Sequence, residues 1–176
     1  MSLQLPQALI DLEANCGIFA VWMLLEHHSI NVEINQLSKL CCHDDEDGTF
    51  TIGLVVGLKK LGFEVSFYTD QDPDIHDKEI TSYAEAQVLH IPMSDALNYQ
   101  QIQKFIAQGY FAIVYYDTLQ DIGNHSLVYS IDDNEICFFD SFDAMPKAVF
   151  EQQRKAVGIC QQVIVIGEYH QPKRYS

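Results

Sequence analysis

Basic residues are scarce in this chain. Ten lysines and arginines stand against 25 aspartates and glutamates over 176 residues, which gives a formal net charge of −15. A nucleic-acid-binding surface needs clustered positive charge to contact phosphates, and an anionic membrane attracts the same kind of surface. The charge therefore argues against nucleic acid and against a membrane as partners. It favours solubility without identifying a partner.

Long apolar runs are also missing. No stretch approaches the roughly 20 apolar residues that a membrane-spanning helix needs. The residues from Met1 to Pro6 contain no basic region followed by an apolar core, which is the pattern of a secretory signal. The five cysteines are odd in number and follow no disulfide-framework spacing, so we expect reduced thiols and a cytoplasmic protein. Export without a signal, as an injected effector, stays open.

The chain shows no internal repeat, low-complexity tract or linker, and we expect residues 1–176 to form one domain. Hydrophobic periodicity predicts helices at 15–28, 33–40, 51–61, 98–108 and 146–157, with Thr51 as the cap of the third. It predicts strands at 64–69, 111–116, 125–131, 135–140 and 163–166. Residues 70–80 are predicted to be a loop, and 81–91 stay unassigned. This order predicts an α+β fold with N-terminal helices packed on an antiparallel sheet.

The stretch from Asn15 to His28 organises the chain. Its apolar residues cover nearly the whole circumference of a helix, which predicts burial on most sides. Asn15 is a good N-cap residue, so Cys16 falls in the first turn, where the partial positive charge of the helix favours a thiolate. Gly17 leaves room for a substrate carbonyl beside the sulfur. The alternative, that Cys16 is a small apolar residue at the start of a core helix, is equally open.

A predicted hairpin late in the chain supplies a second candidate group. A two-residue turn at Asp132-Asp133 places His125 opposite Asp140, whereas a turn at Asp133-Asn134 moves Asp140 to a diagonal position on the same face. A carboxylate that accepts from one ring nitrogen fixes the imidazole tautomer and supports the imidazolium. With Cys16, the two residues form a Cys-His-Asp arrangement for nucleophilic catalysis. The alternatives are a polar strand end and a turn-forming aspartate.

These residues resemble those of the C39-like cysteine peptidases, a group of the papain-like superfamily. The resemblance covers roughly residues 13–166 and rests on Asn15-Cys16-Gly17, Gly57 to Phe63, Gly123-Asn124-His125, Tyr129 to Asp133 and Phe139-Asp140-Ser141. It implies a papain-like fold and a peptide or protein substrate. It also implies that Cys16 is the nucleophile, that His125 is the general base and then the acid, and that Asp140 orients His125. The backbone N–H of Cys16 would meet the oxyanion.

One departure from the family pattern concerns the oxyanion hole. The family's side-chain donor is usually a glutamine, and the position it would take, six residues before Cys16, holds Ile10. Gln7 can serve only if the lead-in segment loops out by three residues. Asn15 is the weaker alternative.

Metal-ligating residue types gather in Cys41-Cys42-His43 and in the acidic run that ends at Asp47. Adjacent cysteines rarely chelate one zinc ion, and the run lacks the ligand alternation of a calcium loop. We therefore interpret the segment as a solvated acidic loop and expect no metal and no cofactor.

The leading hypothesis for function is a thiol hydrolase that cleaves a peptide or amide bond through Cys16, His125 and Asp140. A protein glutamine deamidase or an acyltransferase would use the same triad, because each reaction passes through an acyl-enzyme. A catalytically inactive binding module on the same fold is the third hypothesis, and the missing glutamine speaks for it. The sequence does not indicate the oligomeric state.

Overall fold

The computed structural model describes residues 4–118 and 122–172. Within these ranges the helices are α1 (Gln7–Ile10), α2 (Cys16–His27), α3 (Ile34–Leu40), α4 (Thr51–Leu61), α5 (Asp77–Val88), α6 (Tyr99–Ala107) and α7 (Lys147–Arg154). The strands are β1 (Phe63–Tyr68), β2 (Met93–Ser94), β3 (Phe111–Asp117), β4 (Gly123–Ile131), β5 (Glu135–Phe138), β6 (Met145–Pro146) and β7 (Val163–Tyr169). Every predicted helix and strand is present, with ends that differ by a few residues.

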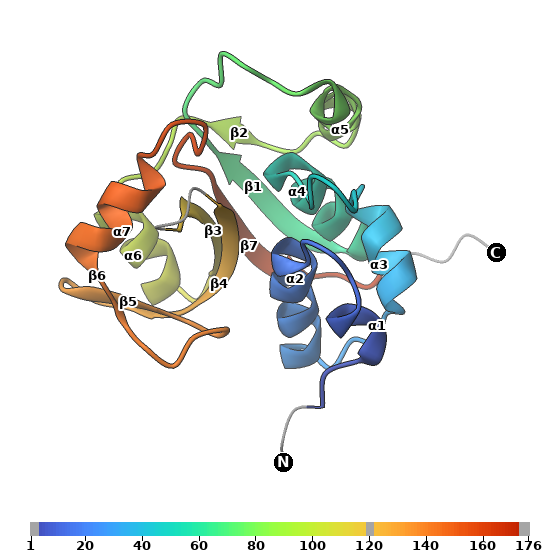
Figure 1. Ribbon diagram of the computed structural model, residues 1–176, viewed down its shortest axis with the longest axis horizontal. Helices are drawn as coiled ribbons and strands as arrows, with labels where there is room; N and C mark the ends of the chain where they lie inside the picture. Colours follow the sequence, from blue (N-terminus) through green and yellow to red (C-terminus); the bar gives the residue numbers. More distant parts are fainter. Residues whose placement is uncertain (1–3, 119–121, 173–176) are drawn as a thin grey trace.

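The strands form a 7-stranded sheet in the order β2-β1-β7-β3-β4-β5-β6 (Figure 1). Neighbouring strands run antiparallel except β1 and β2, which are parallel. Strand β7 comes last in the sequence but lies between β1 and β3, where Ile164 pairs with both Phe67 and Ile113. The predicted antiparallel sheet is confirmed, and β2 adds a short parallel strand at its edge.

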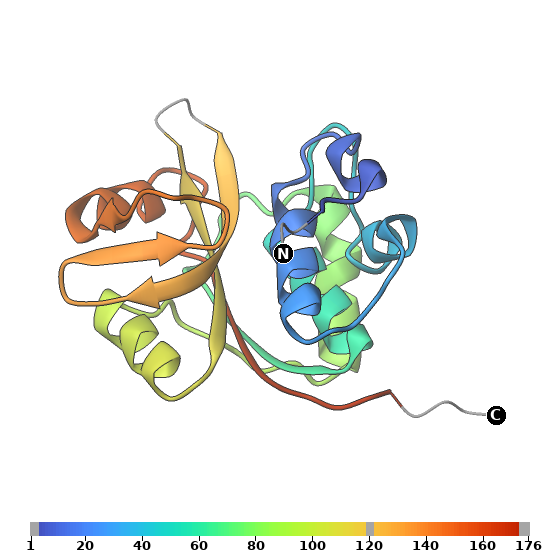
Figure 2. The same ribbon diagram turned by 90° about the horizontal axis from the view of Figure 1, so that it is seen from below.

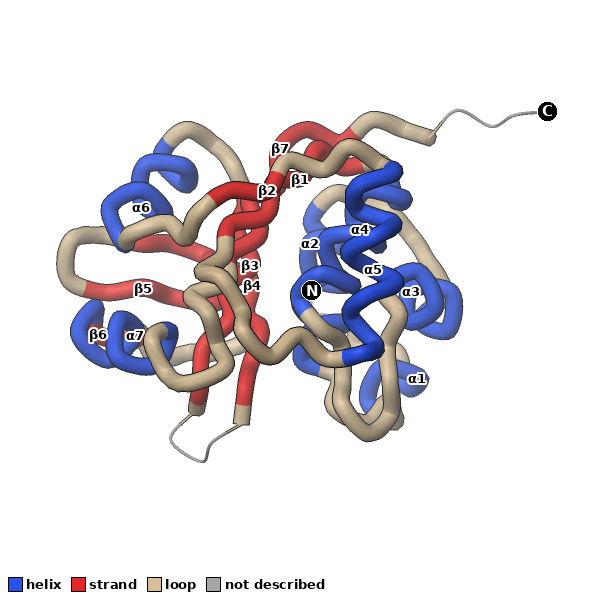
Figure 3. The backbone as a smooth tube through the Cα atoms, turned by 90° about the horizontal axis from the view of Figure 1, so that it is seen from above, coloured by secondary structure: helices blue, strands red, loops and turns tan. Residues whose placement is uncertain are grey.

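Helices cover both faces of the sheet, as Figures 2 and 3 show, with α1 to α5 on one side and α6 and α7 on the other. Alternate residues of the central strands therefore face different cores. One core holds Ile113, Leu127, Ile164 and Ile166 against α2 and α4. The other holds Ala112, Val114, Val128, Val163 and Val165 against Ile102 of α6 and Phe150 of α7. Burial on both faces explains the apolar runs at 111–114 in β3 and 163–166 in β7.

Helix α2 is the central helix of the first core, as predicted. Its residues Ile18, Val21 and Leu24 are fully buried, at 0% exposure, and the helix packs on β4. Its start lies close to the start of α4, since a Cβ on Gly17 would come within 3.2 Å of Leu54. The two helix N-termini are therefore neighbours on the same side of the sheet.

Helix α4 packs on Cys41 through two glycines. A Cβ on Gly53 would overlap the carbonyl oxygen of Cys41, and a Cβ on Gly57 would overlap its Sγ. Any larger residue would push α4 away from the α3 end, so the absence of a side chain here sets how closely α3 and α4 approach.

The prediction that residues 70–80 form a loop is wrong at its end, because α5 begins at Asp77. The helix starts there because His76 and Glu79 form a capping box, in which the His76 side chain accepts from the backbone N–H of Lys78 and the Glu79 carboxylate accepts from the backbone N–H of His76. No helix in the described ranges combines the length and the apolar composition needed to cross a membrane.

Candidate active site

The structure places Cys16 and His125 near each other. Cys16 is the first residue of α2, and its half-buried thiol is free. His125 lies on β4, on the face of the sheet that α2 covers, and is only 4% exposed. The Cys16 Sγ and the His125 Nδ1 are 3.9 Å apart, although the residues are 109 positions apart in the sequence. A thiol at a helix start beside an imidazole is the geometry that nucleophilic cysteine chemistry needs.

The predicted capping role of Asn15 is wrong. Asn15 is the N-cap residue of α2, but its side chain makes no capping hydrogen bond. Its amide instead donates to the carbonyl oxygen of Leu9 over 2.7 Å. The other predicted oxyanion donor, Gln7, donates its amide to Asp11 over 2.8 Å. In this structure both amides are engaged within the lead-in segment, and their oxyanion role stays a prediction.

Beside the turn, the β4–β5 hairpin has the register predicted for a turn at Asp133-Asn134, but beyond Tyr129 it differs from both predicted registers. Ile131 pairs with Ile136 beside the turn, but Val128 pairs with Phe138, so β4 has one more residue than β5 between these pairs. This is a β-bulge at Tyr129, and a shift of one residue turns every later side chain to the other face. Continuing from the bulge, the register places Asp140 opposite Ser126 rather than His125.

Asp140 accordingly belongs to a different set of contacts. The Ser126 Oγ donates to the Asp140 Oδ2 over 3.1 Å, and the amide of Asn124 donates to the Ser126 Oγ over 3.1 Å. The Tyr116 hydroxyl lies 2.8 Å from the same Oγ. Burial raises the pKa of Asp140, and the Ser126 hydrogen bond partly opposes that effect. The orienting role of Asp140 toward His125 stays a prediction.

The second ring nitrogen of His125 has a different partner, which the sequence did not reveal. Its Nε2 lies 2.9 Å from the Oγ1 of Thr51, the first residue of α4. Thr51 donates in turn to the Oε1 of Gln162 over 2.5 Å. The predicted cap of α4 is therefore wrong by one residue, since Phe50 is the N-cap and the Thr51 hydroxyl points to the sheet. Tyr115 stacks on the His125 ring, with 4.3 Å between ring centroids.

Burial dominates the electrostatics of the pair. It lowers the pKa of His125 to about 3, because the charged imidazolium loses its hydration. It also raises the pKa of Cys16, and the contact with His125 opposes that effect only in part. At neutral pH the resting pair is therefore a thiol and a neutral imidazole. The reaction then needs His125 as a base that takes the thiol proton when sulfur attacks.

A cavity of about 540 Å³ opens onto Cys16 and His125. It shares Asp47, Thr49 and Tyr115 with a second cavity of about 340 Å³. Together they form a cleft whose lining residues include the acidic side chains Glu46, Asp47, Asp72, Asp74 and Glu79. Among the described residues, no lysine or arginine lines either cavity.

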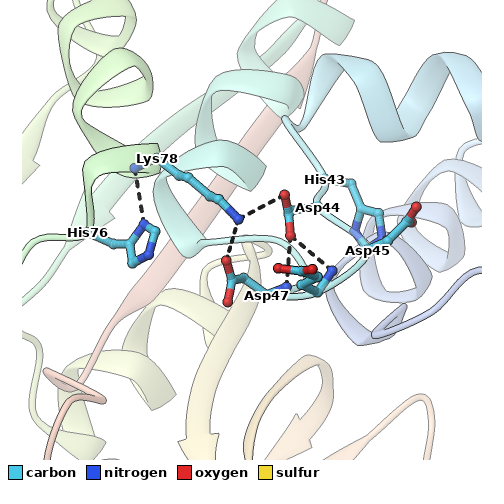
Figure 4. A network of polar contacts seen from close by, with 7 residues as sticks. His43, Asp44, Asp45, Asp47, His76 and Lys78 are labelled. Carbon is cyan, nitrogen blue, oxygen red and sulfur yellow. Dashed lines mark hydrogen bonds and ion pairs between the residues drawn. The ribbon is translucent and has the colours of Figure 1, made fainter.

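The acidic loop at residues 43–48 forms one wall of this cleft, and Figure 4 shows how it is held. The Asp44 carboxylate accepts from the backbone N–H of Asp47, and Lys78 pairs with Asp44 at 3.0 Å and with Asp47 at 2.6 Å. These bonds lower the pKa of Asp44 to about 2. His43 Nδ1 lies 2.7 Å from the Oγ1 of Thr49, which also lines the cleft. The loop is thus an ordered wall, fastened to α5 by Lys78.

Three described residues offer ligand atoms close enough to share a metal ion: Glu64, Glu168 and His170. All three are exposed. Phe63, next to Glu64, contacts His28 just after the end of α2, whereas Cys16 lies at its start. A 12-residue helix is about 18 Å long, so this group is separate from the cleft.

Comparison with known proteins places this chain in a family. The family model described as "Peptidase C39 family" matches residues 9–153. The chain belongs to the peptidase C39 family. It is therefore a cysteine peptidase-like enzyme, and a peptidase family implies a protein or peptide substrate. The resemblance seen in the sequence is confirmed.

A solved structure supports the fold independently. The crystal structure of the peptidase domain of Streptococcus ComA, a bifunctional ABC transporter involved in a quorum sensing pathway, matches with a TM-score of 0.54 and 20% identity. The match covers 86% of this chain and 90% of that chain. The papain-like α+β fold of the C39 chain is therefore confirmed. Among curated proteins, no match is found.

Proposed function

We propose that this C39 family member is a thiol hydrolase that cleaves a peptide or amide bond with Cys16 as nucleophile and His125 as general base. The observation that carries the proposal is the 3.9 Å approach of the Cys16 Sγ to the His125 Nδ1 inside the cleft. A base must lie within reach of the proton it takes, and distances in an unliganded site are often longer than in the reacting complex.

The reaction follows from the positions of these two side chains. His125 Nδ1 takes the thiol proton as the Cys16 sulfur bonds to the substrate carbonyl carbon. The C–N bond then breaks, and His125 returns the proton to the leaving amine, which leaves a thioester on Cys16. Water attacks the thioester with His125 again as base, and the S–C bond breaks to release the carboxylic acid and the thiol.

The oxyanion of each tetrahedral intermediate needs hydrogen-bond donors. The backbone N–H of Cys16 at the start of α2 is the proposed donor, because the Asn15 side chain leaves the first turn uncapped. Asn15 also lines the cleft, so its amide is the proposed second donor if it leaves the Leu9 carbonyl. Gln7 would have to leave Asp11 to take that role.

A peptide library and an ammonia assay test the proposal together. We expect the wild-type protein to cut library peptides, with new termini detected by mass spectrometry, and Cys16→Ser to abolish cleavage. Ammonia release without cleavage would replace hydrolysis by deamidation, and transfer to an added amine would replace it by acyl transfer. If neither the wild type nor Cys16→Ser changes any peptide, the domain is a binding module.

A further inference from the structure

Three buried polar side chains from different parts of the chain meet behind His125. Thr51 is 2% exposed, Gln162 is 5% exposed and His125 is 4% exposed. Thr51 comes from the first turn of α4, and Gln162 directly precedes β7. Gln162 also lies outside the segment that the family model matches. A polar chain in such a dry place is costly unless each member is satisfied.

The chemistry of the three groups sets the direction of the hydrogen bonds. The Oε1 of Gln162 is a carbonyl oxygen and can only accept, so the single hydroxyl proton of Thr51 goes to Gln162. The Thr51 oxygen is then left with lone pairs toward His125, 2.9 Å away, so the Nε2 of His125 must donate. A neutral imidazole carries one ring proton, and if Nε2 holds it, Nδ1 is free to accept.

We propose that Thr51 and Gln162 are positioning residues for His125: they hold its ring proton on Nε2, so that Nδ1 faces the Cys16 thiol as a base. This inference rests on the proposed function, for which it supplies the partner that orients the base. The observed relay runs from His125 through Thr51 to Gln162 and contains no carboxylate.

A neutral partner suits the surroundings of this histidine. The N-termini of both α2 and α4 lie beside the pair, with Cys16 and Thr51 as their first residues. The positive ends of two helix dipoles favour a thiolate and disfavour an imidazolium. The relay therefore stabilises the correct tautomer of a neutral base and does not hold a permanent positive charge.

The pH dependence of Cys16 alkylation by iodoacetamide tests the relay without a substrate. The first lysine or arginine of the chain is Lys39, so the tryptic peptide 1–39 contains Cys16 as its single cysteine. Mass spectrometry of that peptide reports Cys16 separately from the other cysteines. Loss of one neutral hydrogen bond corresponds to a loss of about tenfold or somewhat less in rate.

Four variants are expected to change Cys16 alkylation in different ways. Thr51→Val and Gln162→Leu are expected to slow alkylation at neutral pH about tenfold. Thr51→Ser restores the rate because it keeps the hydroxyl. Gln162→Glu places a carboxylate behind the relay, supports the imidazolium and moves the onset of alkylation to lower pH. In a His125→Ala background the same charge acts only through space on the thiolate, so the shift disappears or reverses.

Nitrogen NMR of wild-type His125 separates the relay from the proposed function. At neutral pH we expect a protonated Nε2 and an unprotonated Nδ1. A proton on Nδ1 would overturn the relay while leaving peptide cleavage intact. The same conclusion would follow if Gln162→Glu and Gln162→Leu moved the pH onset of Cys16 alkylation in the same direction. The expected tautomer without any turnover would overturn the proposed function and leave the relay standing. If Thr51→Val does not fold, the wild-type spectrum and the comparison of Gln162→Glu with Gln162→Leu still test the relay.

Discussion

The Asp140 Oδ2 accepts a hydrogen bond from the Ser126 Oγ, 3.1 Å away, on the opposite face of β4 from His125. The observed contact and the predicted triad imply opposite effects of the Asp140 charge on the pKa of Cys16. In the structure, the negative charge of Asp140 raises the pKa of Cys16, after burial as the main cause. In a triad the same carboxylate would support the imidazolium and help the thiolate form.

Asp140→Asn distinguishes the two arrangements. From the observed geometry we expect the onset of Cys16 alkylation to move slightly to lower pH, because a nearby negative charge is removed. The predicted triad requires the onset to move to higher pH. The measurement is the rate of iodoacetamide labelling of peptide 1–39 against pH, with Ser126→Ala as a control that keeps the charge.

The burial of His125 makes stability depend on pH. Its pKa is about 3 in the folded state, against about 6.5 in an unfolded chain. The unfolded state therefore binds more protons between these values, and stability rises with pH in that window. Above the pKa of the unfolded chain, His125 does not lower the free energy of unfolding. Below that pKa, the free energy of unfolding falls by about 1.4 kcal/mol per pH unit.

Urea unfolding of wild type and His125→Gln between pH 4.5 and 7 measures this effect. The raised pKa of Asp140 acts in the opposite direction, so the difference between the two proteins is the useful quantity. As the pH falls from 7 to 4.5, we expect the free energy of unfolding of the wild type to decrease more than that of His125→Gln. The exposed His170→Gln is the matched control, and a pH-independent difference for His125→Gln would contradict the buried neutral histidine.

The close approach of α4 to Cys41 predicts the cost of two alanine substitutions. Gly57→Ala overlaps the Cys41 Sγ, whereas Gly53→Ala overlaps its carbonyl oxygen. Overpacking of this kind costs about 1–3 kcal/mol in the free energy of unfolding. Adding Cys41→Ala removes the sulfur but not the carbonyl, so it should relieve Gly57→Ala and leave Gly53→Ala unrelieved. Equal relief of both in urea titrations would argue against this packing.

The acidic cleft predicts a preference for positively charged reagents and substrates. With Glu46 and Asp47 lining the cavity of Cys16, opposite charges are drawn in and like charges are repelled. We expect Cys16 to react faster with a cationic than with an anionic methanethiosulfonate reagent at low salt. The ratio of the two rates should fall as salt screens the cleft.

Lys78→Met sharpens that test, because it removes the cation paired with Asp44 and Asp47. The rate ratio should rise, and amide exchange in the loop at 43–48 should become faster as its tie to α5 is lost. Lys104→Met is the control, since α6 lies on the other side of the sheet. A ratio that responds equally to both variants would show that overall charge, not the cleft, sets the preference.

Local patterns predict much of this fold because they report burial directly. The apolar residues around the whole circumference of α2 indicate a helix buried between other elements. The start of α2 at Cys16 follows from the N-cap position of Asn15. The apolar runs in β3 and β7 likewise follow from burial on both faces. Placing Cys16 at a helix start and His125 on a strand therefore needs only short-range information.

The partner of His125 could not be obtained in the same way. An unpredicted bulge at Tyr129 turns Asp140 to the other face. The alternation of residues along a strand does not indicate where a bulge adds one residue. Thr51 looks like a helix cap in the sequence, but its hydroxyl is directed instead to His125 and Gln162. Gln162 becomes relevant only because β7 is inserted beside β3, which is a property of topology.

The position of β7 also has a consequence for synthesis. It pairs with β1 on one side and β3 on the other, so within the described sheet it joins β1 and β2 to the strands from β3 to β6. While a ribosome is still making the chain, α2 and β4 are complete before β7 exists, and the contacts that unite the two parts are long-range and slow to form. Gln162 emerges together with that strand. The thiol, the imidazole and Thr51 are thus made early, but Gln162, the last member of the proposed relay, arrives only with the strand that closes the sheet, so maturation of the site coincides with completion of the fold.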